Sequence, residues 1–363
     1  MLFLILIFVR WKGFSLTKKT LVIYHNSCMD GSVSAALSVL AEGVSSDVYT
    51  MSLNYPHDGG DCVDAFGVNI VDKIVDFGGV SKIMLVDFSI PPSQVAELFS
   101  MVGGDIYIFD HHDAYKREDV LECGVLLDGF KEWVESERCV FKSNWSGSKL
   151  VFDYFRREVL SNVPFDINPF EFERFVQMIN DRDTWVRKNK EAFSFHEAVS
   201  GDVLQDERAL LGEIVRADES SSGCFKITEK IKNGFNDWFK RSLDIGDALV
   251  LYRDDIIVNL VKLFAVVHDK NDLVPCGYVT MDCPRSLVDE TSEYMRSVFP
   301  QSSLFLFLVE KGGSDYMAVS VRSRNGTSLA RNFARRFNGG GHPDAAGCYI
   351  ERSVYECITK LAM

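Results

Sequence analysis

From residue 20 onward the sequence alternates short apolar runs with segments of helical period, and this alternation limits the possible folds more than any other feature. Four apolar runs predict buried strands, at residues 20–25, 48–55, 82–89 and 105–112. Helical patterns at 32–42 and 92–102 separate the first two strands and the last two. Strand–helix–strand alternation is typical of a mainly parallel sheet with helices on both faces. The sequence therefore predicts an α/β fold.

The later part of the chain predicts more helices and then a second unit. Residues 146–160 and 169–185 have helical patterns, and residues 216–223 form a polar, Ser-rich stretch of the kind found in linkers. Residues 225–243 predict an amphipathic helix that connects two domains, because apolar side chains recur every four residues. From residue 247 apolar runs predict a strand-rich unit, with a hairpin at the segment KGGSD, residues 311–315.

These patterns predict four segments along the 363 residues. We expect an N-terminal extension at 1–19, an α/β domain at 20–215, a linker and connector helix at 216–246, and a smaller α/β domain at 247–363. The extension holds nine apolar residues in a row, too few for the roughly 20 that span a bilayer. An added strand, a partner-binding tail or a misassigned start is favoured over a membrane anchor.

Composition narrows the function classes. The chain is 47% hydrophobic, which is enough for a packed core, and its formal net charge of −13 argues against a broad surface for duplex DNA. Acidic surfaces also serve solubility alone, so the charge does not itself indicate a ligand. Nine cysteines are scattered without a C-x-x-C pair, which argues against a zinc knuckle or a disulfide framework. A reducing compartment, the cytoplasm, fits best.

Ionisable side chains stand at the C-terminal ends of three predicted strands and on one predicted helix. They are His25 with Asp30, then Asp87, then Asp110, His111 and His112, with Asp181 and Asp183 on the helix. Ligands of open parallel sheets bind beside the carboxyl ends of the strands. Carboxylates and imidazoles suit Mn²⁺, Fe²⁺, Co²⁺ or Mg²⁺, and converging carboxylates repel one another unless cations bridge them. The pattern therefore predicts a two-metal site.

The same residues carry a resemblance to a known family. The segments HNSCMDGSVSAA (25–36), VDFS (86–89), DHH (110–112) and NDRDTW (180–185) resemble the four motifs of the DHH phosphoesterase superfamily. VSVRS (319–323) and GGGHPDAAG (339–347) resemble the C-terminal substrate-binding domain associated with it. Each motif alone is weak, but five in order over about residues 20–350 are specific. One branch of the superfamily is most similar, the oligoribonuclease (nanoRNase-like) and cyclic-nucleotide phosphodiesterase branch. The similarity rests on the patterns H-x-x-C-x-D-G, DFS, the SG at 146–147 and DRD-x-W.

The resemblance implies metal ligands for two Mn²⁺ ions, with Mg²⁺, Co²⁺ or Fe²⁺ as substitutes. One ion would be held by His25 and Asp87, and the other by Asp30, Asp87, His111 and Asp181. Cys28 stands where most members of the superfamily have an Asp. It would be a thiolate ligand, leave a coordination position open for water, or be an inert buried thiol.

The resemblance also implies roles around the ions. Asp110 would accept a hydrogen bond from an imidazole and so fix its tautomer, and His112 would face the scissile phosphate. Asp183 would partner Arg182 or a helix end, or contact a metal or the attacking water. His196, like His57 and His268, has no motif around it and is expected to be a loop or packing residue.

In the C-terminal domain the resemblance implies a phosphate site. Gly340 and Gly341 would allow close approach of the backbone to a ligand, and His342 would donate to a phosphate. Arg322, with Ser323 beside it, would clamp a terminal phosphate. The alternative is a Gly-rich turn with an exposed histidine.

The function that follows is hydrolysis of short oligonucleotides, or of linear or cyclic dinucleotides, to mononucleotides by metal-activated water. Two alternatives stay open: an exopolyphosphatase or pyrophosphatase, and a non-catalytic nucleotide sensor that has lost a metal through Cys28. Neither duplex DNA nor a membrane is an expected partner. The sequence leaves the oligomeric state open, a homodimer included.

Overall fold

The computed structural model describes residues 19–26, 28–43, 47–54, 62–63, 67–112, 115–124, 126–186, 189–203, 214–218, 223–309 and 316–359. The chain divides between Leu249 and Val250 into two compact units, here named the N-terminal unit and the C-terminal unit. The predicted extension, except for Lys19, and the tip of the predicted hairpin at 311–315 lie outside the described residues, as does His57. Among the helices described, none is both long and apolar enough to cross a membrane.

The N-terminal unit is built on one six-stranded sheet. Its strands follow the order β5-β4-β3-β1-β2-β6, and every pair is parallel except the antiparallel edge pair of β2 and β6. The strands are β1 (Lys19–His25), β2 (Asp47–Leu53), β3 (Val80–Val86), β4 (Ile106–Asp110), β5 (Cys139–Phe141) and β6 (Val215–Arg216). The predicted mainly parallel sheet is therefore confirmed, with its first four strands where the apolar runs placed them.

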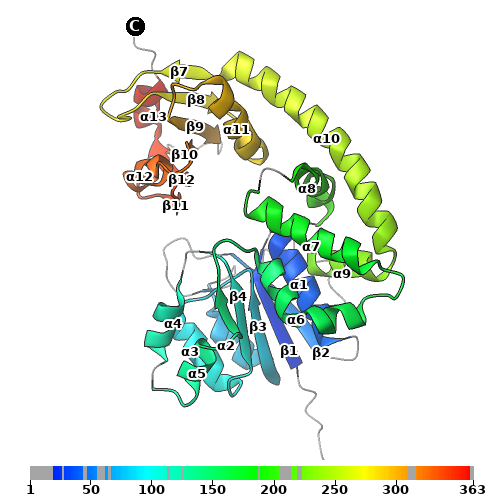
Figure 1. Ribbon diagram of the computed structural model, residues 1–363. Helices are drawn as coiled ribbons and strands as arrows, with labels where there is room; N and C mark the ends of the chain where they lie inside the picture. The colour runs from blue at the N-terminus through cyan, green and yellow to red at the C-terminus, as the bar shows by residue number, and fades with distance from the viewer. Residues whose placement is uncertain are drawn as a thin grey trace, which may run out of the picture. The chain divides into compact units, whose positions relative to one another are not determined.

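Helices cover both faces of this sheet, as Figure 1 shows for the N-terminal unit. One face carries α1 (Met29–Glu42), α6 (Gly147–Asn162), α7 (Pro169–Asp183) and α8 (Lys190–Val203). The other carries α2 (Ile70–Phe77), α3 (Pro92–Met101), α4 (Arg117–Cys123) and α5 (Phe130–Val134), of which the sequence predicted only α3. Successive residues of a strand point to opposite faces. Val22 and Tyr24 accordingly lie in the first core, and Leu21 and Ile23 in the second.

Local chemistry fixes the starts of α6 and α7, both of which the sequence predicted. The Ser146 hydroxyl accepts a hydrogen bond from the Lys149 N–H at 3.3 Å and caps α6. The Asn168 side chain caps α7 by accepting from the Phe170 N–H at 2.9 Å, and Pro169 occupies the first turn, where its missing N–H costs nothing. The start of α6 matters for the site because its first residues contact Asp30.

The structure corrects two predictions on the segment after residue 223. The single helix predicted at 225–243 is two helices, α9 (Gly223–Lys232) and α10 (Phe235–Phe264), separated by a turn at residues 233–234. The strand predicted from residue 247 is wrong, because α10 continues to Phe264. In this run Ile257 and Val261 are buried four residues apart while Leu263 is 74% exposed, which is the pattern of a helix with one buried face.

The C-terminal unit has a mixed sheet of its own. The strand order is β11-β12-β10-β9-β8-β7, parallel only between β8 and β9. Strands β9 and β10 are antiparallel neighbours, as the predicted hairpin requires. The elements are β7 (Val266–His268), β8 (Tyr278–Asp282), a 3₁₀ turn (Arg285–Leu287), α11 (Val288–Val298), β9 (Leu304–Val309), β10 (Tyr316–Ser323), α12 (Leu329–Arg335), β11 (Gly340–His342), β12 (Ala345–Glu351) and α13 (Arg352–Thr359).

Candidate metal centre

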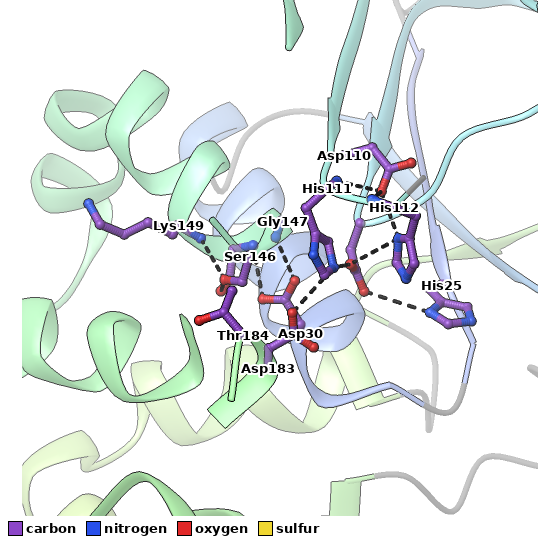
Figure 2. A network of polar contacts seen from close by, with 12 residues as sticks. His25, Asp30, Asp110, His111, His112, Ser146, Gly147, Lys149, Asp183 and Thr184 are labelled. Atoms are coloured by element: carbon purple, nitrogen blue, oxygen red, sulfur yellow. Dashed lines mark hydrogen bonds and ion pairs between the residues drawn. The ribbon is translucent and has the colours of Figure 1, made fainter. Parts of the chain in front are cut away.

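Ionisable side chains from three strand ends and two helices meet at one edge of the N-terminal sheet. Strand β1 ends at His25, β3 is followed by Asp87, and β4 ends at Asp110, followed by His111 and His112. The first turn of α1 adds Asp30 and the last turn of α7 adds Asp183. Figure 2 shows the side chains of His25, Asp30, Asp183 and residues 110–112 gathered in one place. The convergence predicted from the strand ends is present, since parallel strands bring their carboxyl ends to one edge.

Asp87 is the centre of this arrangement. Its side chain is fully buried, with Oδ1 3.0 Å from His111 Nε2 and Oδ2 3.9 Å from His25 Nδ1. Oδ2 accepts no hydrogen bond from the part of the chain that the structure describes. Its backbone is left-handed, with φ of 52°, which is uncommon for a residue other than glycine. Burial, and next the charge of Asp30, raise the pKa of this carboxyl well above its ordinary value.

Among the described residues the donor atoms form three groups of three, and Asp87 belongs to two of them. The first triad is His25, Cys28 and Asp87; the second triad is Asp30, His111 and Asp183; Asp87, His111 and His112 form the third group. Within each triad the donor atoms lie within 4.8 Å of one another. The two oxygens of Asp87 face different triads, because Oδ1 contacts His111 and Oδ2 lies toward His25. The two oxygens of this one carboxylate therefore point to different donor groups.

The charges of the cluster also fit cations. Burial, and next the charge of Asp30, raise the pKa of Asp183 to about 6. Burial lowers the pKa of His111, but the hydrogen bond to Asp87 and the charge of Asp183 outweigh it and raise the value to about 10. The proton on His111 thus partly neutralises carboxylates that would otherwise repel one another. A divalent cation would neutralise them more fully, so the donor set and its excess negative charge fit bound metal.

Asp110 holds the two histidines that follow it. Its Oδ1 accepts from the His111 N–H at 2.8 Å, from the His112 N–H at 3.3 Å and from His112 Nδ1 at 2.8 Å. Burial alone would raise the pKa of Asp110, but the hydrogen bond from His112 outweighs it and the value falls to about 2. An ionised acceptor at this distance keeps the proton of His112 on Nδ1 and leaves Nε2 to face a ligand.

The structure brings Asp183 to the cluster, and not Asp181. The Nε2 of His111 lies 3.2 Å from Asp183 Oδ2. Asp181 instead accepts three amide hydrogen bonds, from Gln177 at 2.6 Å, Asn180 at 3.3 Å and Asn189 at 2.7 Å. Asp181, which the sequence predicted as a ligand, therefore lies outside the donor groups, and Asp183 lies in one of them.

The N-terminus of α6 supports Asp30, a contact that the sequence did not predict. The N–H groups of Gly147 and Ser148 donate to Asp30 Oδ2 at 2.6 Å and to Oδ1 at 3.0 Å. A Cβ atom on Gly147 would lie 2.6 Å from the Cβ of Asp87, so only glycine fits here. The only signal in the sequence was the SG pair before the predicted helix.

Neither a family model nor a curated protein sequence matches this chain. Several solved structures do match this chain. The DHH domain of a protein from a family of ribosomal proteins aligns with 94% of this chain and 85% of its own, at 14% identity and a TM-score of 0.55. This chain therefore shares the fold of that DHH domain.

Two further matches have lower TM-scores. The pGpG-specific phosphodiesterase PggH from Vibrio cholerae aligns with 94% of this chain and 96% of its own, at 11% identity and a TM-score of 0.45. The exonuclease RecJ bound to manganese aligns with 94% of this chain and 88% of its own, at 13% identity and a TM-score of 0.45.

Cys28 lies inside the cluster of this DHH-fold chain. It precedes α1 in an extended conformation, and its side chain makes no capping hydrogen bond to that helix. Burial, and next the charge of Asp87, raise the pKa of this thiol well above its ordinary value. Its sulfur lies within 4.8 Å of donor atoms of His25 and Asp87.

A cavity of 110 Å³ adjoins the cluster and is lined by Cys28, Asp183, Arg182, Trp185 and His196, among others. The Arg182 guanidinium lies 4.4 Å from the centre of the Trp185 ring. The sequence predicted Arg182 as a partner of Asp183 and gave His196 no role, whereas both side chains border the site.

In the C-terminal unit Arg322 and Ser323 make internal contacts. Arg322 Nε donates to Asp289 Oδ1 at 2.7 Å, and its side chain is 15% exposed. Ser323 is fully buried and donates to Asp344 Oδ1 at 2.9 Å. A phosphate would therefore have to compete with Asp289 for Arg322, and it would not reach the hydroxyl of Ser323 without a rearrangement.

The glycine-rich segment forms strand β11. Gly340 and His342 are exposed, and a Cβ atom on Gly340 would meet nothing within 4 Å. Gly341 has a φ of 133°, and a Cβ atom there would lie 2.7 Å from the Cα of Ala346 on β12. Gly341 is thus required by the pairing of β11 with β12, whereas the sequence predicted close approach to a ligand.

Proposed function

We propose that the N-terminal unit binds two divalent cations and hydrolyses phosphate diesters. One observation supports this most: the two oxygens of the buried Asp87 face two separate sets of donors. A carboxylate shared in this way is the central element of two-metal phosphoesterase sites. The likeness to the solved DHH domain supports the fold, and the motifs support the chemistry.

The ligands in this proposal are the two triads. His25, Cys28 and Asp87 would hold one ion, and Asp30, His111 and Asp183 the other, with Asp87 shared. Bound divalent ions would polarise a phosphoryl group and make water more acidic, which is the chemistry a diester requires. We propose Mn²⁺ as the ion of the second triad, whose ligands are oxygen and nitrogen atoms only.

The other residues position the substrate. Asp110 holds the Nδ1–H of His112, so His112 can contact a phosphoryl oxygen through Nε2. The N–H groups of Gly147 and Ser148 fix the orientation of Asp30 through both of its oxygens. A rigid carboxylate and a rigid imidazole reduce the reorganisation needed in the transition state.

We propose short oligonucleotides or dinucleotides, linear or cyclic, as substrates. The motifs H-x-x-C-x-D-G and DRD-x-W support this choice, because they resemble the oligoribonuclease and cyclic-nucleotide phosphodiesterase branch most. All nine cysteines are free thiols, which supports a reducing, cytoplasmic location. Gly340 and His342, exposed on β11, are the residues we propose to contact a substrate in the C-terminal unit, with Arg322 once it is released from Asp289.

The test is metal-dependent hydrolysis of a substrate panel: pApA, a pentanucleotide RNA, cyclic AMP, a cyclic dinucleotide, pyrophosphate and short polyphosphate. The Asp87→Asn variant removes the shared carboxylate, and Asp72→Asn, an exposed position on α2, is the matched control. We expect mononucleotides from pApA or the pentanucleotide with wild type and Asp72→Asn, and none with Asp87→Asn. His342→Ala reports on the C-terminal unit through KM.

Two outcomes would contradict the proposal in different ways. Turnover of pyrophosphate or polyphosphate alone would assign the chain to the phosphohydrolase alternative. Binding of both metal and nucleotide without turnover of any substrate would make it a sensor.

A further inference from the structure

The two triads differ in one donor. The second triad offers two carboxylates and an imidazole, whereas the first offers a carboxylate, an imidazole and the thiol of Cys28. We propose that the first triad is a thiolate site that selects a softer ion, Zn²⁺, Co²⁺ or Fe²⁺, so that the centre holds two different metals. This rests on the two-metal centre proposed above, but not on its substrate.

The geometry of the first triad suits a tetrahedral ion. Ligand atoms 2.0–2.3 Å from such an ion stand roughly 3.3–3.8 Å from one another. The His25 Nδ1 and Asp87 Oδ2 atoms are 3.9 Å apart, and the Cys28 sulfur lies within 4.8 Å of both. Only small side-chain movements would bring all three donors to one ion.

A second observation points to a cation beside the thiol. Asp87 is fully buried, and its Oδ2 atom accepts no hydrogen bond from the described residues. A buried carboxylate oxygen without a donor is costly, and a cation in the first triad would remove that cost. A thiol that binds no cation would leave that cost in place.

The surroundings of Cys28 differ from those of the cysteines that fill the cores. Cys139, Cys224 and Cys348 are each buried within one of the hydrophobic cores. Cys28 belongs to none of these cores, and its sulfur lies within 4.8 Å of donor atoms of His25 and Asp87. Its sulfur therefore faces polar donor atoms in place of apolar packing.

The proposed binding step conserves charge and needs no oxidant. The S–H bond of Cys28 breaks, its proton passes to solvent, and a sulfur–metal bond forms without a change of oxidation state. Thiolates favour Zn²⁺, Co²⁺ and Fe²⁺ over Mn²⁺ and Mg²⁺ more strongly than carboxylates do. The carboxylates of the second triad give no such preference, so the two positions would differ in the ion they hold.

The experiment is a titration of the metal-free full-length protein with Co²⁺, followed by absorption spectroscopy. A cobalt–thiolate bond gives a charge-transfer band in the near ultraviolet that oxygen and nitrogen ligands do not give. The variants are Cys28→Ser, Cys28→Asp and the control Cys123→Ser, which changes an exposed cysteine on α4. Circular dichroism of each variant establishes that it is folded.

We expect the band in wild type and Cys123→Ser, and its loss in both Cys28 variants while Co²⁺ still binds. Zn²⁺ should abolish the wild-type band and Mn²⁺ should not. In Cys28→Asp the preference for Zn²⁺ over Mn²⁺ should fall on the order of 10–100-fold, as expected for a changed ligand environment.

Co²⁺ bound to wild type without the band, or a band that persists in folded Cys28→Ser, would overturn the thiolate site and leave the metal centre standing. Failure of wild type to bind Co²⁺, Mn²⁺ or Zn²⁺ would overturn the metal centre and the proposed function with it.

Discussion

Replacing Asp183 by asparagine should stabilise the metal-free protein and at the same time remove most of its stabilisation by metal. The pKa of Asp183 is raised from 3.8 to about 6, so the folded state binds this proton more tightly than the unfolded chain does. Ionising the group at pH 7 therefore costs the folded state about 1.4 kcal/mol per pH unit of that difference, or about 3 kcal/mol in all. Asparagine carries no such charge.

The pH dependence has a definite sign. Below pH 4 Asp183 is protonated in both states and costs nothing. The cost grows as the pH rises from 4 to 6 and is complete above 6, so Asp183→Asn should gain stability over wild type in that interval.

Metal narrows the stability difference between the two proteins, because it stabilises wild type more than Asp183→Asn. An ion at about 100 times its Kd stabilises the folded state by about 3 kcal/mol. A weakened ligand set typically lowers affinity 10–100-fold, which corresponds to about 1.4–2.7 kcal/mol of that gain. The measurement is urea unfolding at pH 7 in EDTA and in Mn²⁺, with calorimetry for the affinity.

Asp181→Asn on the same helix is the matched control. Its three amide donors, from Gln177, Asn180 and Asn189, would face an NH₂ group in place of one oxygen, so the metal-free protein should lose about 1–3 kcal/mol. Its stabilisation by metal should remain. A metal response that disappears in Asp181→Asn and survives in Asp183→Asn would refute the assignment made from the geometry.

Three further predictions address the surroundings of the centre and the C-terminal unit. Gly147→Ala places a Cβ atom 2.6 Å from that of Asp87, so the free energy of unfolding should fall by about 1–3 kcal/mol and calorimetry should show a weaker metal affinity. Gly340→Ala, whose Cβ atom would lie in open space, is the control and should change neither quantity. Asp110→Asn weakens the hold on the neighbouring imidazole, so kcat should fall about 10–100-fold while the metal stoichiometry measured by mass spectrometry stays the same. Asp344→Ala removes the acceptor for the N–H groups of residues 326 and 328, so amide exchange there should speed up.

The sequence predicted the N-terminal sheet because buried parallel strands are marked by continuous apolar runs, which residues 20–25 and 82–86 display. The convergence of His25, Asp87 and Asp110 follows from the same property, since each residue ends or directly follows such a strand. These features are local in sequence, and the topology of a parallel sheet converts them into proximity.

The choice between Asp181 and Asp183 could not be made in this way. Two helical residues that are two positions apart point about 200° away from each other. Which of the two faces the sheet depends on how α7 is rotated about its axis. The packing of α7 determines that rotation, and a sequence motif does not indicate it. Asn189, eight residues beyond Asp181, supplies one of the contacts that hold Asp181 away from the cluster.

The extent of α10 was missed for a related reason. The run from residue 247 is rich in β-branched and aliphatic residues, which favour strands in isolation. Tertiary packing overrides that preference, because Ile257 and Val261 bury one helical face while Leu251 and Leu263 remain exposed.

Two motif glycines, Gly31 and Gly147, lie close to Asp87 of another motif. A Cβ atom on Gly31 would lie 2.4 Å from the carbonyl oxygen of His25 and 3.2 Å from Asp87 Oδ2, and one on Gly147 would lie 2.7 Å from the Cα of Asp87. The start of α6 can therefore approach Asp87 only because Gly147 lacks a side chain, whereas Gly31 is required chiefly by the His25 carbonyl oxygen and also lies close to Asp87. This close approach buries the carboxylate completely and removes water that would otherwise solvate it. A carboxylate so deprived of solvent binds a cation more strongly, so a larger residue at either glycine should weaken metal binding even though neither glycine is a ligand.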